Sequence, residues 1–209
     1  FFSPLLGKPN LYNILASFSI LKALNISFNN LDKILQEFKV IQGRMEVINA
    51  KNFKIIIDYA HTPHSIEELY KNVLNLFKPK RMLCLISAAG SRDKWKRIVI
   101  GEIAAKYCHY IVISNEDPFE ENPEEILKSI EIGVKNYLSE FGIEKPVEII
   151  KDREKAIYKL VELAQKGDII VSIGKGNEPS IIFKEKIIPW NEKEVFINAL
   201  KNYSKISTK

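Results

Sequence analysis

The strongest constraint on the fold is an alternation between residues 55 and 173, where short apolar runs rich in β-branched residues alternate with longer segments of helical periodicity. The predicted strands are Ile55–Tyr59, Met82–Ser87, Tyr110–Ser114, Val147–Ile150 and Asp168–Ile173. The predicted helices are Ser65–Phe77, Trp95–Tyr107, Pro123–Phe141 and Arg153–Gln165. Strands joined through helices need right-handed crossovers and form a largely parallel sheet covered on both faces. The sequence therefore predicts a Rossmann-like α/β fold.

The segments before and after this alternation set the expected domains. Residues 9–24 and 31–38 have helical spacing but too little apolar surface to fold alone, so we expect them to end a larger domain. Gly43 breaks the helical pattern, and the extended residues that follow begin a new domain. We therefore expect residues 1–42 and 43–209 to belong to different domains. The second domain should close with an edge strand within Ile181–Ile188 and a helix over Asn191–Tyr203.

Composition narrows the function classes. The 31 basic and 26 acidic residues are mixed along the chain, which argues against a nucleic-acid-binding stripe. No apolar run approaches the roughly 20 residues that span a bilayer, so we expect a soluble cytoplasmic protein. The chain lacks an initiator Met, which suggests a fragment. Cys84 and Cys108 stand in apolar contexts without paired spacing, so we expect two unpaired core residues of a reducing compartment.

Polar residues cluster where the predicted strands end. In a parallel sheet these ends share one edge, where ligands bind. The clusters are Asp58 to Pro63 (Asp-Tyr-Ala-His-Thr-Pro), Ala89 to Lys94, Asn115 to Pro118, and Gly174 to Glu178. Glycines allow close approach of backbone N–H groups and arginine offers a bidentate fork, so an anionic ligand is one interpretation. The alternative is that these residues cap helices or lie in solvated loops.

Six motifs in order resemble the Mur ligase family, most closely its tripeptide-synthetase branch. They are Gly7-Lys8-Pro9-Asn10-Leu11-Tyr12-Asn13, Gly43-Arg44-Met45-Glu46, Asp58-Tyr59-Ala60-His61-Thr62-Pro63, Ser91-Arg92-Asp93-Lys94, Asp117-Pro118 and Gly174-Lys175-Gly176-Asn177-Glu178. The resemblance covers nearly the whole chain. It implies an ATP- and Mg²⁺-dependent ligase that joins an amino acid to a UDP-N-acetylmuramyl peptide. By this resemblance, residues 1–42 end the central ATPase domain and residues 43–209 form the C-terminal domain.

The resemblance assigns roles to individual positions. For the nucleotide they are Asn10 and Asn13 beside the adenine, Arg44 at the phosphates, Asp58 at the ribose and His61 nearby. For the incoming amino acid they are Arg92 at its α-carboxylate, Glu178 at a side-chain amine, and Asp117 and Gly174 around it. The motifs contain no phosphate loop, catalytic residue or metal ligand, so we expect these in other parts of the intact enzyme and expect this chain alone to be inactive.

Two departures from the family pattern bear on specificity. Diaminopimelate-adding members often read Asp-Asn-Pro-Arg where this chain reads Glu116-Asp117-Pro118-Phe119, which favours lysine or ornithine as the amino acid. Asn177 also replaces the usual His. Two alternatives stay open: a ligase similar to folylpolyglutamate synthase, which usually has Asp-Gly-Ala-His-Asn-Pro in the first cluster, and a non-catalytic module that binds an amino acid or a partner.

Overall fold

The computed structural model describes residues 3–27 and 30–206 and contains two sheets and seven helices within them. The helices are α1 (Lys8–Ala23), α2 (Leu31–Glu37), α3 (Pro63–Phe77), α4 (Trp95–Tyr107), α5 (Pro123–Phe141), α6 (Arg153–Leu163) and α7 (Glu192–Ile206). The strands are β1 (Glu46–Asn49), β2 (Lys54–Ile57), β3 (Met82–Ile86), β4 (Tyr110–Ile113), β5 (Val147–Ile149), β6 (Ile169–Ser172), β7 (Ser180–Phe183) and β8 (Lys186–Pro189). No helix in these two ranges is long and apolar enough to cross a membrane.

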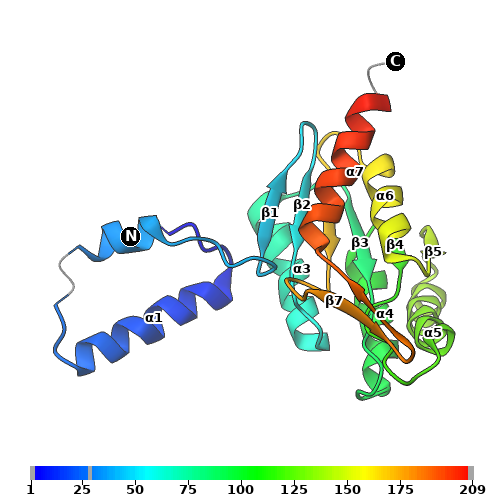
Figure 1. The fold of residues 1–209 in the computed structure, drawn as a ribbon, viewed down its shortest axis with the longest axis horizontal. Coiled ribbons are helices and arrows are strands. Elements are labelled where there is room, and N and C mark those ends of the chain that lie inside the picture. The colour runs from blue at the N-terminus through cyan, green and yellow to red at the C-terminus, as the bar shows by residue number, and fades with distance from the viewer. Residues whose placement is uncertain (1–2, 28–29, 207–209) are drawn as a thin grey trace.

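The main sheet has six strands in the order β1-β2-β6-β3-β4-β5 (Figure 1). β1 pairs antiparallel with β2, and every other neighbouring pair is parallel. The register places Ile57 of β2 beside Ser172 of β6, and Leu85 of β3 beside the same Ser172. The carboxyl ends of these strands therefore meet at one edge. The predicted Rossmann-like fold is confirmed.

Helices cover both faces of this sheet because its strand residues alternate between two apolar cores. Ile56 and Ile86 point into a core with α3, α4 and α5, whereas Ile57 and Leu85 point into a second core with α6 and α7. This alternation is the period of two that a pleated strand imposes. The nine predicted elements between residues 55 and 173 are all present, with ends that differ by two residues or fewer.

The predicted edge strand within Ile181–Ile188 is wrong. This segment folds into the separate hairpin of β7 and β8, which pair only with each other as strands. Lys184 and Glu185 form its turn, and a single parallel bridge from Phe183 to Phe119 attaches it to the loop after β4. The apolar run is therefore two short strands rather than one.

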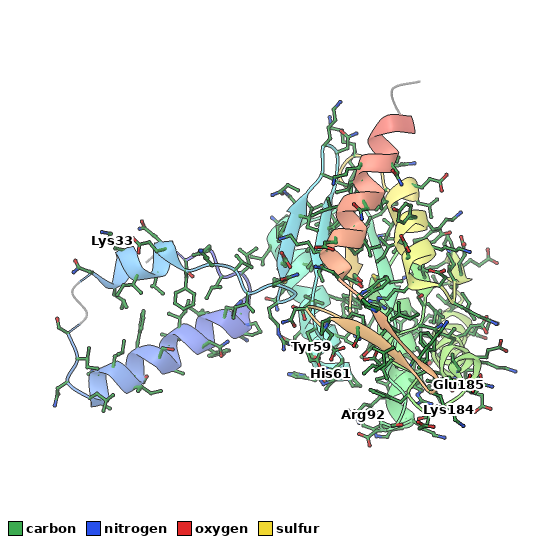
Figure 2. The ribbon with its side chains drawn as sticks, in the orientation of Figure 1. Lys33, Tyr59, His61, Arg92, Lys184 and Glu185 are labelled. Atoms are coloured by element: carbon green, nitrogen blue, oxygen red, sulfur yellow. A yellow bond between two sulfur atoms is a disulfide. The ribbon has the colours of Figure 1, made fainter. Side chains whose placement is uncertain are left out.

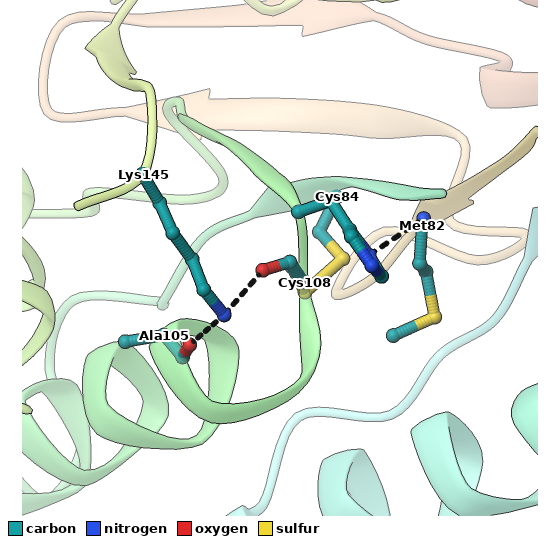
Figure 3. The surroundings of a disulfide bond; sticks show 6 residues. Met82, Cys84, Ala105, Cys108 and Lys145 are labelled. Atoms are coloured by element: carbon teal, nitrogen blue, oxygen red, sulfur yellow. Dashed lines mark hydrogen bonds between the residues drawn. A yellow bond between two sulfur atoms is a disulfide. The ribbon is translucent and has the colours of Figure 1, made fainter. Parts of the chain in front are cut away.

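The expectation of two unpaired cysteines is also wrong, because Cys84 and Cys108 form a disulfide (Figure 3). Cys84 lies on β3 and Cys108 directly follows α4, and both are fully buried, as expected for core residues. Helix α4 follows β3 in the chain and packs back against it, which brings together two cysteines that are 24 positions apart in the sequence. Lys145 covers this end of α4 by donating to the carbonyls of Ala105 and Cys108.

Candidate functional site

The loop after β2 begins with Asp58, whose carboxylate is held by backbone N–H groups. Its Oδ2 accepts from the N–H of Met45 at 2.6 Å and its Oδ1 from the N–H of Ala60 at 2.7 Å. Burial raises the pKa of Asp58, while these two N–H groups and the nearby Arg44 oppose that rise. The loop ends where Thr62 caps α3 through a reciprocal pair of hydrogen bonds with Ser65. The structure thus brings Asp58 and Arg44 together.

Tyr59 lies under Arg44 and beside His61. The Arg44 guanidinium carbon is 4.3 Å from the centre of the Tyr59 ring, a distance typical of a cation–π contact. The His61 ring meets the Tyr59 ring edge-on at 5.0 Å, and its Nδ1 lies 3.1 Å from the Tyr59 carbonyl oxygen. Arg44, which precedes β1, and His61, in the loop after β2, are both exposed.

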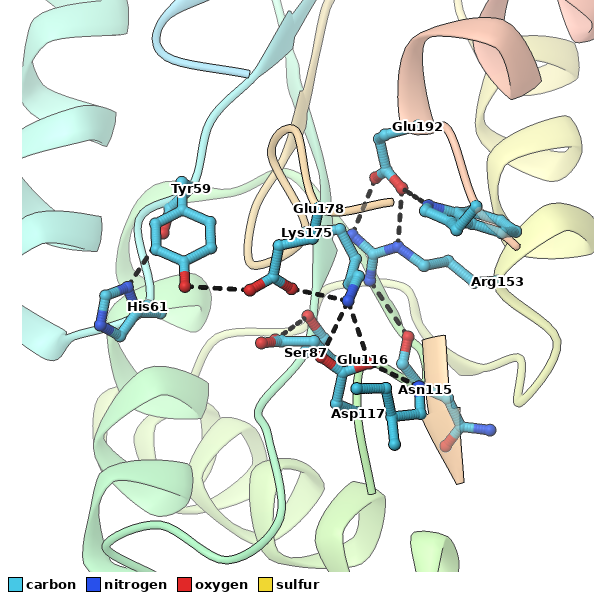
Figure 4. A network of polar contacts seen from close by, with 12 residues as sticks. Tyr59, His61, Ser87, Asn115, Glu116, Asp117, Arg153, Lys175, Glu178 and Glu192 are labelled. Carbon is cyan, nitrogen blue, oxygen red and sulfur yellow. Dashed lines mark hydrogen bonds and ion pairs between the residues drawn. The ribbon is translucent and has the colours of Figure 1, made fainter. Parts of the chain in front are cut away.

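Three carboxylates gather around the fully buried Lys175, and we call this group the Lys175 cluster: Glu116, Asp117, Lys175 and Glu178 (Figure 4). The Lys175 Nζ donates to both oxygens of Asp117, at 2.9 and 2.8 Å, and to Glu178 Oε2 at 2.6 Å. Asp117 also accepts from the N–H of Ile182 at 2.8 Å, which anchors β7. One ammonium group therefore binds two carboxylates, so these groups have negative charge left over even without Glu116.

Glu116 is a buried carboxylate of this cluster, with its side chain beside Gly174. Its Oε2 accepts from the Ser87 hydroxyl at 2.7 Å. Burial raises the pKa of Glu116, and the Ser87 bond and the charges of Arg153 and Lys175 counteract this only in part. A Cβ at Gly174 would lie 2.3 Å from the same Glu116 oxygen, and the φ of Gly174 is +95°. Gly174 is needed both for its backbone conformation and for this close approach.

A buried ion pair supports two of the loops from below. Arg153 at the start of α6 pairs with Glu192 at the start of α7 through two bonds of 2.8 and 2.9 Å. Arg153 also donates to the carbonyls of Asn115 and Ile173, which precede the Glu116 and Gly174 segments. Burial opposes ionisation of Glu192, but Arg153 keeps its pKa below the ordinary value. The pair therefore fixes the spacing between the loops after β4 and β6.

Arg92 lies near the turn of the β7–β8 hairpin (Figure 2). It lines a pocket of about 740 Å³ between the loop after β3 and this hairpin, and no residue of the Lys175 cluster lines that pocket. Its guanidinium carbon is 5.8 Å from the centre of the Phe119 ring, and the side chain is exposed. Phe119 has a φ of +53°, which is unusual for a bulky residue. Lys184 and Glu185 line the same pocket from the hairpin turn.

Two basic residues in or near the strand-end clusters, Lys175 and Arg97, are occupied by internal carboxylates. Lys175 is neutralised as described, and the guanidinium of Arg97 holds both oxygens of Glu121, at 3.0 and 2.9 Å. The Lys94 ammonium is also near Glu121, at 3.7 Å. Arg92 and Arg44 are the predicted cations whose guanidinium groups stay exposed.

No contact described in residues 3–27 and 30–206 joins Asn10 or Asn13 to Arg44 or Asp58. Both lie on α1, which extends away from the sheet (Figure 1). Asn10 donates to the carbonyl of Leu6 at 2.7 Å, and the Asn13 side chain is exposed. Within residues 3–27 and 30–206, no group of three or more His, Cys, Asp or Glu side chains is arranged to hold a metal ion.

The sequence did not reveal the Tyr59 hydroxyl, Arg153 or Glu192 as parts of this site. The Tyr59 hydroxyl donates to Glu178 at 3.0 Å, although 119 positions separate the two residues. Arg153 and Glu192 are 39 positions apart. Such partners have no local spacing that could indicate them, whereas the strand-end loops could be found because each is contiguous.

Comparison with known proteins assigns residues 43–176 to a described family domain. The profile "Mur ligase, glutamate ligase domain" matches this range. The matched range contains the whole six-stranded sheet, and it includes Arg44, Asp58, Asp117 and Lys175.

Individual relatives extend the similarity over nearly the whole chain. The chain is 38% identical over 203 residues to a UDP-N-acetylmuramyl-tripeptide synthetase of Borreliella burgdorferi, covering 96% of this chain and 39% of that protein. It is 35% identical over 207 residues to a UDP-N-acetylmuramoyl-L-alanyl-D-glutamate–2,6-diaminopimelate ligase of Prochlorococcus marinus, with the same coverage. The chain thus spans about two fifths of the length of these curated relatives.

A solved structure of a UDP-N-acetylmuramoyl-L-alanyl-D-glutamate–2,6-diaminopimelate ligase has the same fold. It superposes with a TM-score of 0.70 and 25% identity, over 97% of this chain and 40% of that one. The likeness includes the N-terminal helices as well as the sheet, because so little of this chain is left out.

Proposed function

This chain belongs to the Mur ligase family, and from that membership we propose that it is the C-terminal part of an ATP-dependent ligase for peptidoglycan precursors. The reaction would join an amino acid to a UDP-N-acetylmuramyl dipeptide. The γ-phosphoryl group of ATP would be transferred to the carboxylate of the dipeptide, which gives an acyl phosphate and ADP. The amine of the amino acid would then attack the acyl carbon, forming the amide and releasing inorganic phosphate and a proton. The protein would contribute by positioning the groups and stabilising anionic charge.

One observation carries this proposal: the loops with the nucleotide-type and amino-acid-type residues touch each other at the carboxyl edge of the sheet. A Cβ at Gly43 would lie 2.3 Å from the backbone of Gly176 and Asn177. The Arg44 loop is therefore packed against the loop that ends at Glu178. Two substrates held by these loops would lie close together, as a transfer between them requires.

For the nucleotide, we propose Arg44 at the phosphates, Asp58 at the ribose and His61 nearby, with Asn10 and Asn13 beside the adenine. Both Asp58 oxygens already accept one N–H each, but a carboxylate oxygen has a second lone pair that a ribose hydroxyl could use. Residues 3–27 and 30–206 contain no group of three or more possible metal ligands, and we propose that the Mg²⁺ ligands lie in other parts of the full-length enzyme.

For the amino acid, we propose that Arg92 binds the α-carboxylate and Glu178 the side-chain amine. Asp117 and Gly174 shape the site indirectly: Asp117 holds Lys175 and the hairpin, and Gly174 leaves room for Glu116. The unneutralised charge of the Lys175 cluster favours a second cation. We therefore propose a substrate with a basic side chain, lysine or ornithine.

Phe119 supports this specificity because it stands where a guanidinium would hold a distal carboxylate. An unpaired carboxylate at that place would cost roughly 3 to 5 kcal/mol, which is a discrimination of several hundredfold or more. Relatives of comparable identity include both a tripeptide synthetase and a diaminopimelate ligase, so family membership alone leaves the amino acid open.

The test is a ligase assay on the full-length product of the gene that encodes this chain. We expect ATP-dependent amide formation, with kcat/KM for L-lysine or L-ornithine at least about a hundredfold above that for meso-diaminopimelate. In the Phe119→Arg variant the added guanidinium should narrow this ratio by about tenfold or more. A wild-type preference for diaminopimelate would show that Lys184 or another cation holds the distal carboxylate. No amide formation with any of the three amino acids would contradict the proposed reaction.

A further inference from the structure

Tyr59 connects the two proposed substrate sites. The centre of its ring lies 4.3 Å from the Arg44 guanidinium carbon. Its hydroxyl donates to Glu178 Oε1 at 3.0 Å (Figure 4). We propose that Tyr59 is a positioning residue that couples these sites, so that a nucleotide bound at Arg44 raises the affinity for an amino acid at Glu178. The inference rests on the proposed function of both sites and adds a connection between them.

Backbone packing keeps Tyr59 between the two loops. A Cβ at Gly176 would lie 2.8 Å from the Tyr59 Cβ and 3.0 Å from the Gly43 carbonyl oxygen. Real Cβ atoms essentially never come closer than 3.0 Å to such neighbours. The loops at Gly43, Tyr59 and Gly176 therefore pack backbone against backbone. A shift of one loop must be transmitted to the others or open a gap between them.

The Tyr59 hydroxyl holds the Glu178 oxygen that Lys175 does not hold. Lys175 binds Oε2 at 2.6 Å, and Tyr59 binds Oε1. Burial and the neighbouring Glu178 raise the pKa of Tyr59, so its hydroxyl keeps its proton and stays a donor at neutral pH. Without this hydroxyl the carboxylate would keep one fixed oxygen and could rotate about it. The remaining lone pairs of Glu178 would then no longer point in one direction for an incoming ammonium group.

A phosphate bound to Arg44 would act on this arrangement through the Tyr59 ring. An anion that pairs with the guanidinium restricts its motion over the ring, which in turn restricts the ring and its hydroxyl. The amino acid then meets a Glu178 carboxylate that is already ordered, so part of the entropic cost of its binding has been met. Because coupling between two binding equilibria is reciprocal, the amino acid must raise the affinity for the nucleotide by the same factor.

The experiment measures this factor by calorimetric titration in the full-length protein. The Kd of ADP is determined without L-lysine and with saturating L-lysine, and the Kd of L-lysine is determined with and without ADP. In the wild type we expect L-lysine to lower the Kd of ADP about fivefold or more, with an equal effect in the reverse titration. In Tyr59→Phe, which keeps the ring below Arg44, both ratios should fall to about one while the Kd of ADP alone changes less than about twofold.

Tyr158→Phe is the matched control, because it also removes one hydroxyl, a partner of Asn202 on the outer face of α6 and α7. This variant should keep the wild-type ratio. Arg44→Lys changes the other partner of the contact with the Tyr59 ring: it keeps a cation for the phosphate but removes the planar guanidinium. This variant should also lower the ratio of the two Kd values. It can be used if Tyr59→Phe fails to fold.

The outcomes separate the coupling from the proposed function. A ratio of one in the wild type, or a wild-type ratio in Tyr59→Phe, overturns the coupling and leaves the two sites as proposed. If Arg44→Ala leaves the Kd of ADP unchanged and Glu178→Gln leaves the Kd of L-lysine unchanged, the sites themselves are misassigned. The coupling then falls with them.

Discussion

Single glycines determine how closely the substrate loops approach, and this can be measured as stability. Gly43 and Gly142 both have positive φ, of 66° and 61°, but a Cβ at Gly142 would meet nothing within 4 Å. Gly142→Ala should therefore lose only the backbone term, about 1 kcal/mol of unfolding free energy. Gly43→Ala adds a collision with backbone atoms of Gly176 and Asn177 and should cost about 2 to 4 kcal/mol.

Denaturant unfolding of the wild type and both variants gives the loss of unfolding free energy in each, and the comparison is valid where the m-values are equal. A smaller or equal loss in Gly43→Ala would mean that the loops at Gly43 and Gly176 do not lie in contact in solution. That result would also weaken the observation on which the proposed function depends, because the two loops could then hold their ligands apart.

At the scale of secondary structure elements, the loop after β3 and the start of α4 are joined through the side chain of Glu121. Its carboxylate accepts from the N–H of Ser91 at 2.6 Å and from the guanidinium of Arg97, and the Arg97 bonds are the main reason that its pKa falls to about 2. A carboxyl group whose pKa is lower in the folded state stabilises the fold above its unfolded pKa, near 4.5, and loses this effect as the pH falls towards 2.

The wild type should therefore lose more thermal stability between pH 4.5 and pH 2 than Glu121→Gln does, since the variant has no carboxylate to protonate. Thermal unfolding followed by circular dichroism across this range gives the comparison. Glu120→Gln, at the exposed neighbouring position, is the control and should follow the wild type. Parallel curves for all three proteins would show that the contacts of Glu121 add nothing to stability.

The five parallel strands of the main sheet and the helices between them could be predicted because their signals are local, whereas the antiparallel edge strand β1 was expected only as part of an extended segment. The apolar run before Asp58 lies within β2, and the helical spacing before Tyr107 lies within α4. Each pattern is contained in a single element, and both elements were predicted. The β7–β8 hairpin was missed because a single apolar run contained both strands, with only the charged pair Lys184 and Glu185 to mark the turn. The Cys84–Cys108 disulfide was missed because it depends on α4 folding back onto β3.

The candidate site was predictable in part for the same reason. The loops containing Asp58 and Gly174 follow predicted strands, so a parallel sheet must bring them to one edge. Which side chains neutralise one another could not be predicted, because pairs such as Lys175 with Asp117 join different loops. Lys175 therefore looked available for an anionic ligand, although the structure shows it fully buried among carboxylates.

For the whole molecule, the first helix, α1, differs from the elements of the sheet domain that follow. α1 has no buried residue, and apolar side chains such as Leu11, Leu15 and Ile20 are at least 49% exposed. The two apolar cores, in contrast, are made of buried residues between Met45 and Ala199. We expect the exposed apolar residues of α1 to be covered in the full-length protein, because this chain spans only about two fifths of its curated relatives.

A truncated chain of residues 43–209 should accordingly fold as well as the chain of residues 1–209. The described contacts that would be lost are few: the N–H of Lys8 donates to Asn72, the N–H of Arg44 donates to the carbonyl of Ile41, and Leu6 packs beside the first core. We expect the Tm to change by less than about 4 °C, which corresponds to roughly 1 kcal/mol for a protein of this size, and aggregation on heating to decrease.

A chain that ends at Phe183 is the control: it lacks Glu192 and Phe196 of α7, leaves Arg153 as an unpaired buried charge and should not fold. Scanning calorimetry of the three chains gives their Tm values. A decrease in Tm of about 10 °C or more in the chain of residues 43–209 would show that the N-terminal helices stabilise the sheet domain and that residue 43 is no domain boundary.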